Sequence, residues 1–250
     1  MRARGVFGGV LLTVLVGACA GNSVRSGEIT ATEHPGLTDD AREGDTNGLE
    51  STVAPVDSAA NEPLRQRTYD VLALEELVVR GCSLGVIIES VEDLESPREL
   101  GRLVLPGSVN GLELLRPGLI AVGSGGAGLF FVDISTPSAP RKTGELDLEG
   151  ALWRLHRQGD RLLIAAGHQG VVISDGGQRI VGTWSSGGYV RQARPVGDDR
   201  AIVADGRRGV ALLDLSEPTN PRLLGALDTA GEARAVDLRD DTAFVADFHN

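Results

Sequence analysis

A short apolar cassette recurs along the chain and constrains its fold more than any other feature. Each copy opens with a glycine and four mostly apolar residues, and the two best copies continue with Asp, an apolar residue and Ser-x-Pro-x-x-Pro. The copies begin at Gly85, Gly128, Gly170 and Gly209, which are 43, 42 and 39 residues apart. A repeat of about 40 to 45 residues made of short strands is typical of a β-propeller, in which each repeat forms one blade.

Aligned on their glycines, the repeats predict four strands each. In the second repeat the strands are expected at 109–115, 119–122, 128–134 and 141–148, with Pro117-Gly118 as the first turn. We therefore predict an all-β fold, a β-propeller with about four and a half four-stranded antiparallel blades. The expected repeats are 67–106, 107–149, 150–188, 189–230 and a partial repeat at 231–250.

Two copies depart from the pattern. The third lacks the Ser-x-Pro segment after Asp175, and the fifth ends before its own glycine-led strand. An incomplete last blade would leave a strand edge unpaired and an apolar face open to water. We therefore expect an N-terminal fragment of a longer propeller. The alternatives are closure of the last two strands onto the first blade, or pairing with another chain.

The first residues are typical of a targeting segment. Arg2 and Arg4 precede an apolar run over 6–16 that is too short to span a bilayer as a helix, which takes about 20 residues. The run ends in Val-Gly-Ala-Cys at 16–19, which resembles the lipobox of bacterial lipoproteins. Residues 1–18 are thus predicted to be a lipoprotein signal peptide and Cys19 the lipidation site. The alternative is an ordinary secretory signal with a chance cysteine.

This lipobox resemblance implies a location. An acylated Cys19 would anchor the protein in a lipid bilayer of the bacterial cell envelope, and Ala20 implies sorting to the outer membrane, on its periplasmic or outer surface. Residues 19–66 are rich in Gly, Ser, Thr, Asp and Glu and contain few apolar residues. Such a segment cannot bury enough apolar surface to fold, so we predict a lipid-anchored, disordered acidic linker.

The repeat as a whole resembles the LVIVD-repeat family of bacterial and archaeal proteins. The residues that carry the resemblance are the glycine, four apolar residues, Asp, Ser and two prolines, best over 107–149 and 189–247. The resemblance extends over 67–250, with weaker first and third copies and with Ser90 where other repeats have Asp. It implies a propeller at the cell surface or envelope and no single activity.

No residue pattern in the sequence indicates catalysis, a cofactor or a metal. The repeated Asp133, Asp175 and Asp214 are interpreted as structural, because an Asp that ends a strand can accept backbone N–H groups of the turn that follows. The repeated glycines at 85, 128, 170 and 209 are interpreted as positions of positive φ. The four histidines lack metal-ligand spacing. They are His34, His156, His168 and His249.

Three large aromatic residues and one cysteine are the remaining candidates. Tyr189 opens the fourth repeat and could present a sugar-stacking surface, although packing between blades is the preferred interpretation for it and for Trp153 and Trp184. Cys82 is interpreted as a small buried side chain at a hairpin rather than a redox group.

Three functions remain open from the sequence. The first is a non-enzymatic, envelope-anchored scaffold that binds a protein or a polysaccharide. The second is a propeller hydrolase or lyase whose site is assembled from several blades near the central channel. The third is a structural envelope protein without a specific small ligand. The net charge of −11 argues against nucleic acid as a partner, because phosphate binding needs a basic surface.

Overall fold

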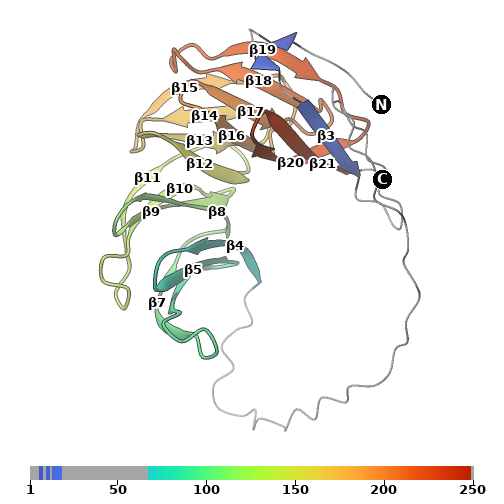
Figure 1. Cartoon of the computed structure of the whole chain (residues 1–250). Helices are drawn as coiled ribbons and strands as arrows, with labels where there is room; N and C mark the ends of the chain where they lie inside the picture. The colour runs from blue at the N-terminus through green and yellow to red at the C-terminus, as the bar shows by residue number, and fades with distance from the viewer. Residues whose placement is uncertain (1–5, 8–9, 12, 19–66, 249–250) are drawn as a thin grey trace, which may run out of the picture.

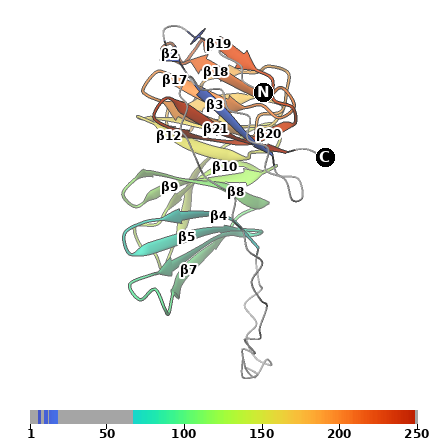
Figure 2. The same ribbon diagram turned by 45° about the vertical axis from the view of Figure 1, so that its right-hand side comes forward.

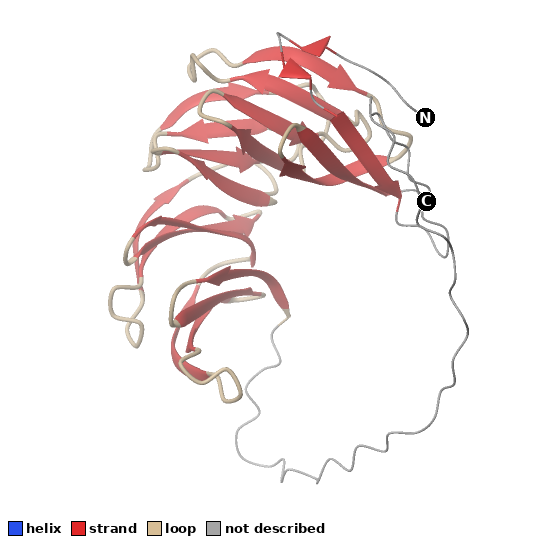
Figure 3. Ribbon diagram, in the orientation of Figure 1, coloured by secondary structure: helices blue, strands red, loops and turns tan. Residues whose placement is uncertain are grey.

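Antiparallel four-stranded sheets, arranged one after another in an open arc, make up most of the described part of the protein (Figures 1 and 3). The computed structural model describes residues 6–7, 10–11, 13–18 and 67–248. The linker expected at 19–66, with Cys19, lies outside the described residues. Four sheets have four strands each and a further sheet has three, so the prediction of an all-β propeller with about four and a half blades is confirmed.

The strands follow one another in each blade from the inner side of the arc to its outer side. Blade 1 contains β4 (Thr68–Ala73), β5 (Leu77–Cys82), β6 (Gly85–Ser90) and β7 (Arg98–Val104). Blade 2 contains β8 (Ser108–Arg116), β9 (Leu119–Gly125), β10 (Gly128–Asp133) and β11 (Arg141–Leu146). Blade 3 contains β12 (Arg154–Gln158), β13 (Arg161–Ala165), β14 (Val171–Ser174) and β15 (Ile180–Trp184). Blade 4 contains β16 (Gln192–Val196), β17 (Arg200–Ala204), β18 (Val210–Asp214) and β19 (Arg222–Leu227).

Blade 5 differs from the others in composition and in strand direction. Its first two strands are β20 (Glu232–Arg239) and β21 (Thr242–Phe248), and they pair antiparallel. The third position is taken by β3 (Thr13–Ala18), which pairs parallel with β21 (Figure 2). Two short strands, β1 (Val6–Phe7) and β2 (Val10–Leu11), form a separate ribbon. β3, which is part of the expected signal peptide, thus occupies the place of the third strand in blade 5. It runs parallel to β21, whereas the third strand of the other blades runs antiparallel to the second.

Apolar side chains fill the spaces between neighbouring blades. One cluster joins Val79 and Ile88 of blade 1 to Leu112 and Val122 of blade 2, and three more clusters join the following pairs of blades. Blades 2, 3 and 4, which have a neighbour on each side, therefore bury both faces of their sheets. This explains why their two central strands are nearly continuous runs of Val, Leu, Ile and Ala instead of alternating with polar residues.

The four-strand order gives the arc an inner wall and two loop-bearing faces. The first strands β4, β8, β12, β16 and β20 contact one another in sequence and form the concave inner wall (Figure 1). Turns between second and third strands lie at the same end as the connections from each fourth strand to the next blade. We call this end the connection face. The turns within the first and second hairpin pairs (strands 1–2 and 3–4) form the opposite hairpin face.

The repeated glycines stand at the start of each third strand. Gly85, Gly128, Gly170 and Gly209 have φ values of 120°, 91°, 91° and 74°. A Cβ atom on any of them would also collide with a carbonyl oxygen of the fourth strand in the same blade. Both the backbone conformation and the close approach therefore require glycine.

A second set of glycines explains the Ser-x-Pro-x-x-Pro segment. Gly101 lies on the outer strand of blade 1, and a Cβ there would collide with the Pro137 carbonyl oxygen in the corresponding segment of blade 2. Gly182 on β15 stands in the same relation to Pro218 of blade 4. The proline turn of one blade thus packs onto the outer-strand glycine of the blade before it. In blade 3, which lacks this segment, Gln178 contacts Gly144 instead.

From the packing of the proline turn on Gly182 we predict an effect on stability. Gly182→Ala should lower the free energy of unfolding by about 1–3 kcal/mol, because the added methyl group must displace the Pro218 backbone. The measurement is urea denaturation of the full chain. The exposed neighbour Thr183 supplies the control, since Thr183→Ala should change stability by less than about 1 kcal/mol. Equal effects of the two substitutions would contradict the packing of Pro218 on Gly182.

Candidate functional site

Four ionisable residues occupy matched positions on the inner wall. Glu113 pairs with Ala121, His156 with Leu163, Arg194 with Ile202 and Asp237 with Phe244, one on each of four consecutive inner strands. We call them the inner-wall row. Sequence reasoning missed this row, although it predicted that any active site would be assembled from several blades near the channel. The sequence does show an ionisable residue near the end of each of these first strands, shortly before the turn that leads to the second strand.

The row neighbours a set of hydrogen bonds that tie each blade to the next. On β4, the Asp70 carboxylate accepts the Leu112 backbone N–H of blade 2, at 2.8 Å. On β16, the Gln192 side-chain oxygen accepts the Val236 N–H of blade 5, also at 2.8 Å. Among the described residues, backbone hydrogen bonds join adjacent blades only at isolated bridges, Gly167–Val190 and Gly206–Ala233. The Asp70 and Gln192 side chains satisfy inner-strand N–H groups that these bridges do not reach.

An ion pair reaches across a whole blade. The Arg154 guanidinium of blade 3 donates to the other Asp70 oxygen of blade 1 at 2.8 Å. Blade 2 has Gly111 at the position between them, and a Cβ there would press against Leu155. Glycine at position 111 therefore allows the inner strands of blades 2 and 3 to approach closely. Blades 1, 2 and 3 are thereby joined at a single carboxylate.

His156 is held in its neutral form. Since the Gln192 oxygen accepts the Val236 N–H, the Gln192 amide nitrogen faces His156 Nε2 at 2.8 Å and donates to it. The proton of the ring must then be on Nδ1. Burial, together with the positive charges of Arg194 and Arg154, lowers the pKa of His156 to about 4. The imidazole is therefore committed to a hydrogen-bond chain that runs from blade 3 through blade 4 to blade 5.

The other members of the row also have partners in the wall. Burial raises the pKa of Glu113, and a hydrogen bond from the Arg157 backbone N–H of blade 3 partly offsets that shift. Arg194 pairs with Asp237 of blade 5, with 2.9 Å between Nη2 and Oδ1. The row contains an acid with a raised pKa and a base with a lowered one, a combination found in acid–base sites. Here each of the four contacts a neighbouring blade.

An aromatic and arginine cluster occupies the connection face over blades 3 to 5. Trp153 Nε1 donates to the Tyr189 hydroxyl at 3.0 Å, and the two rings meet edge to face at 6.0 Å between centroids. The Arg191 guanidinium lies over both rings, 4.2 Å and 4.8 Å from their centroids, and is paired with Glu232. Exposed His168 contacts the Tyr189 ring at 4.6 Å. We call these five residues the aromatic cluster.

A hollow of about 450 Å³ adjoins the aromatic cluster on the connection face. Its lining shares Glu232 with the cluster and adds exposed Arg207 from the turn between β17 and β18. Phe248 and the connection 228–231 complete it. The hollow and the cluster together form a surface of rings, guanidinium groups and backbone at one end of the propeller.

Buried polar residues at the ends of second strands are used within the fold. Ser124 donates to the Pro106 carbonyl, and Thr229 donates to Asp247 at 2.9 Å. Burial raises the pKa of Asp205, while hydrogen bonds from the Ser186 hydroxyl and from Tyr189 oppose the shift. In each case the polar side chain forms a hydrogen bond with the segment that leads from the preceding blade into the first strand of its own blade.

The repeated aspartates lie at the hairpin face, far along the strands from the aromatic cluster. Asp133 accepts the Ser135 N–H at 2.9 Å, and Asp214 accepts the Ser216 N–H at 2.9 Å. Asp175 accepts the Gly177 N–H at 3.0 Å in the shortened turn of blade 3. Hydrogen bonds from the Ser135 hydroxyl and backbone N–H lower the pKa of Asp133, and the Ser216 N–H lowers that of Asp214. Each carboxylate stabilises the turn that follows its strand.

Residues 67–248 contain no group of three His, Cys, Asp or Glu side chains arranged to hold a metal ion. No helix among the described residues is long and apolar enough to cross a membrane. Cys82 is fully buried at the end of β5.

Fold and inner wall together define a β-propeller repeat protein. Two segments of the chain, 120–147 and 196–229, match the model of the LVIVD repeat. These segments span the second to fourth strands of blades 2 and 4, the two copies in which the cassette is most complete. No curated protein matches the chain in sequence.

Several solved structures share the fold at low sequence identity. The computationally designed Ika8 protein has a TM-score of 0.59 and 13% identity, over 71% of this chain and 54% of Ika8. A chain of the mitotic checkpoint complex gives 0.58 and 13%, over 68% and 56%. The WD40 β-propeller domain of Doa1 gives 0.56 and 14%, over 71% and 60%. The chain therefore spans 54–60% of the length of these propellers.

The neutral state of His156 predicts a pH dependence of stability. The folded pKa of about 4 lies below the ordinary value of 6.5, so the unfolded chain binds the proton first as pH falls. Stability should fall between pH 6.5 and 4 by about 3 kcal/mol and level off below. Urea denaturation across this range measures it.

The control is His156→Gln, which keeps an acceptor for the Gln192 amide but does not titrate. Subtracting the pH profile of this variant from that of the wild-type protein removes the contribution of every other group. A difference that stays constant from pH 7 to pH 4 would show that His156 is not held neutral by its surroundings.

Proposed function

We propose that the protein is a non-enzymatic scaffold, anchored by lipid in the bacterial cell envelope, that binds a partner through the connection face of its propeller. Of protein and polysaccharide, the arrangement of the aromatic cluster favours a protein. The observation that supports this most directly is the gathering of Trp153, Tyr189 and Arg191 beside the hollow. Trp, Tyr and Arg are the residue types that contribute most binding energy at protein interfaces.

Contacts within the cluster fix the positions of its side chains. Glu232 holds Arg191, and Arg191 in turn covers the Trp153 ring. A pre-ordered surface loses less side-chain entropy on binding than a flexible one, which favours affinity. A sugar would need an open aromatic face, whereas Arg191 lies over both Trp153 and Tyr189. Exposed His168 and Arg207 remain directed to solvent at the margin of this surface.

The inner-wall row supports binding over catalysis for a physical reason. A general base needs a free nitrogen or oxygen aimed at substrate. The His156 nitrogen that lacks a proton already accepts the Gln192 amide, and Asp237 is paired with Arg194. These groups stabilise the association of blades. A hydrolase or lyase remains the second candidate, on the observation that Glu113 and His156 have pKa values shifted in opposite directions.

Anchoring rests on the sequence. The apolar run at 6–16 and the small residues before Cys19 resemble a lipoprotein signal. An acylated Cys19 followed by 47 residues before the first blade would place the propeller at the end of a long tether. A tethered propeller can search the envelope for its partner while its anchor stays in one membrane.

The connection face makes a binding prediction that can be tested in cells. A photoreactive p-benzoylphenylalanine placed at His168 of the full chain should crosslink to a discrete protein. Arg207→Glu should then reduce the crosslinked fraction at least about fivefold, because reversing a charge within the contact removes binding energy. The readout is the shifted band on an immunoblot.

The same photoreactive residue at Lys142, on the outer strand of blade 2, is the matched control and should give no discrete band. Crosslinks of equal yield from both positions would contradict specific binding at the connection face. Sedimentation with purified peptidoglycan sacculi that Arg207→Glu abolishes would indicate a polysaccharide ligand instead. Release of reducing sugar from those sacculi, lost in Glu113→Gln, would support the enzyme.

Lipidation of Cys19 can be tested separately from binding. Cells that express the full chain should incorporate radiolabelled palmitate into it, and Cys19→Ala should abolish the label and release the protein from the membrane fraction. Cys82→Ala is the control and should keep the label, because that thiol is buried within blade 1. Label retained in Cys19→Ala would refute lipidation at this position without bearing on the binding face.

A further inference from the structure

Two turns on the connection face have the same structure. They join the second strand to the third in blades 3 and 4, over 166–170 and 205–209. Three backbone hydrogen bonds between matched residues close each turn, at 2.8 to 3.1 Å. An isolated bridge then ties each turn to the entry of the next blade, through Gly167 in one and Gly206 in the other. Both turns are therefore held firmly against the blades beside them.

The tips of these two turns present basic side chains to solvent. The turn of blade 3 carries His168 and the turn of blade 4 carries Arg207 and Arg208, and all three residues are exposed. The matching turns of blades 1 and 2 contain no charged residue, since they read Cys-Ser-Leu-Gly at 82–85 and Gly-Ser-Gly-Gly-Ala-Gly at 123–128. The basic turns thus belong to the part of the connection face that holds the aromatic cluster.

The basic side chains extend over two neighbouring connections between blades. His168 Nδ1 donates to the Gly188 carbonyl oxygen at 3.2 Å. The Arg208 side chain crosses the same residue, because a Cβ on Gly188 would lie 2.8 Å from Arg208 Cδ. Arg207 lines the hollow beside the following connection, 228–231. A ligand that contacts both arginines would therefore lie across the entries of blades 4 and 5.

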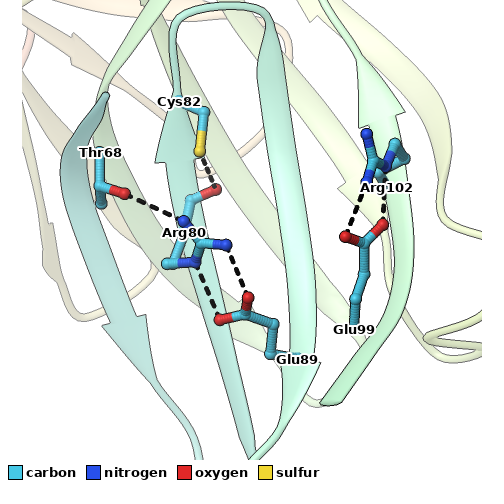
Figure 4. Close-up of polar contacts among 6 residues, drawn as sticks. All are labelled: Thr68, Arg80, Cys82, Glu89, Glu99 and Arg102. Atoms are coloured by element: carbon cyan, nitrogen blue, oxygen red, sulfur yellow. Dashed lines mark hydrogen bonds and ion pairs between the residues drawn. The ribbon is translucent and has the colours of Figure 1, made fainter. Parts of the chain in front are cut away.

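Arg207 and Arg208 have guanidinium groups available to a ligand. The two arginines drawn in Figure 4, by comparison, are held by glutamates of their own blade, Arg80 by Glu89 through two hydrogen bonds. Neither Arg207 nor Arg208 forms an ion pair with a described residue. A guanidinium group binds a carboxylate through two parallel N–H donors, so two such groups can hold two carboxylates of one ligand.

Most acidic groups of this surface are already engaged or buried. Glu232 is held by Arg191 at 2.5 Å and by Arg234 at 3.1 Å. Asp205, beneath the turn of blade 4, is buried. The other carboxylate that lines the hollow is that of Asp228, which is exposed and forms no ion pair with a described residue. The exposed surface therefore offers two guanidinium groups and an imidazole against one carboxylate.

This local charge opposes that of the chain as a whole. The net charge is −11, so most of the protein repels an acidic partner while the two turns attract it. Complementary potentials of this kind orient two proteins as they meet and suppress other ways of docking. Because the turns are fixed before binding, little ordering of the backbone opposes the contact.

We propose that the partner is a protein that presents an acidic segment to the connection face, where Arg207 and Arg208 bind its carboxylates. This assignment rests on the binding role proposed above and specifies the chemistry of the partner. The hollow beside Arg207, with Phe248 in its lining, receives an uncharged part of the same segment.

The test measures binding of a fluorescein-labelled hexaglutamate peptide to the purified full chain, by fluorescence anisotropy in about 50 mM NaCl, where surface charges are weakly screened. Arg207→Gln with Arg208→Gln should raise the dissociation constant at least about fivefold, because two surface charge pairs are lost. Arg116→Gln with Arg239→Gln is the matched control. It removes two exposed arginines from the hairpin face and should change the constant less than about twofold.

Asp228→Asn tests the sign of the interaction independently. Removal of this carboxylate should tighten binding of the peptide about twofold to fivefold, since a like charge no longer opposes it. Equal weakening by the two arginine pairs, or weaker binding to Asp228→Asn, would overturn the proposal. So would polygalacturonate that displaces the peptide at an equal concentration of carboxylates, because that result assigns an acidic polysaccharide.

The crosslink from His168 separates this proposal from the proposed function. A discrete crosslinked protein that is lost in Arg207→Gln with Arg208→Gln, and kept in Arg116→Gln with Arg239→Gln, would support both. A crosslinked protein of unchanged yield in both double variants would leave the binding face intact and overturn the acidic segment. Absence of any discrete crosslink would overturn both.

Discussion

Packing of one blade against the next is the interaction on which the rest of this structure depends. Backbone hydrogen bonds join the described blades only at the isolated bridges Gly167–Val190 and Gly206–Ala233, so apolar clusters must hold the blades together. Each blade in the interior of the arc is buried on both faces. Three further devices refine that packing. The proline turn of one blade seats on a glycine of the blade before it, Asp70 and Gln192 accept backbone N–H groups of the next inner strand, and the Trp153–Tyr189–Arg191 cluster joins blades 3 to 5 at the connection face.

The packing of each blade against the next also constrains the residues of the inner wall. Each first strand must present polar side chains to the centre of the arc, yet it must also tie its blade to the next. Glu113, His156 and Arg194 meet both demands, because each is polar and each contacts a neighbouring blade. The ionisable groups of the wall are thus engaged in contacts between blades. In the proposed scaffold function, the connection face, where the loops end, is the surface offered to a partner.

The sequence pattern predicted the repeat unit well because its physical cause is local. The glycine at the start of each third strand needs a positive φ, and the Asp at its end caps a turn, so both recur wherever the strand recurs. Long-range contacts left weaker signals. Gly101 and Gly182 have no distinguishing neighbours in sequence, and their purpose becomes clear only beside Pro137 and Pro218. Tyr189 and Trp153 were expected to pack between blades, and the hydrogen bond between them joins two blades.

By itself, the sequence determined the number of strands per repeat, the positions of the turns and the order of the blades, because period, turn residues and apolar runs depend on near neighbours along the chain. The tertiary structure alone decided which charged residues meet. Asp70 and Arg154, for example, are two repeats apart in the sequence and yet form an ion pair. Curvature of the arc brings such residues together or leaves them exposed, and curvature arises from the summed packing of whole blades.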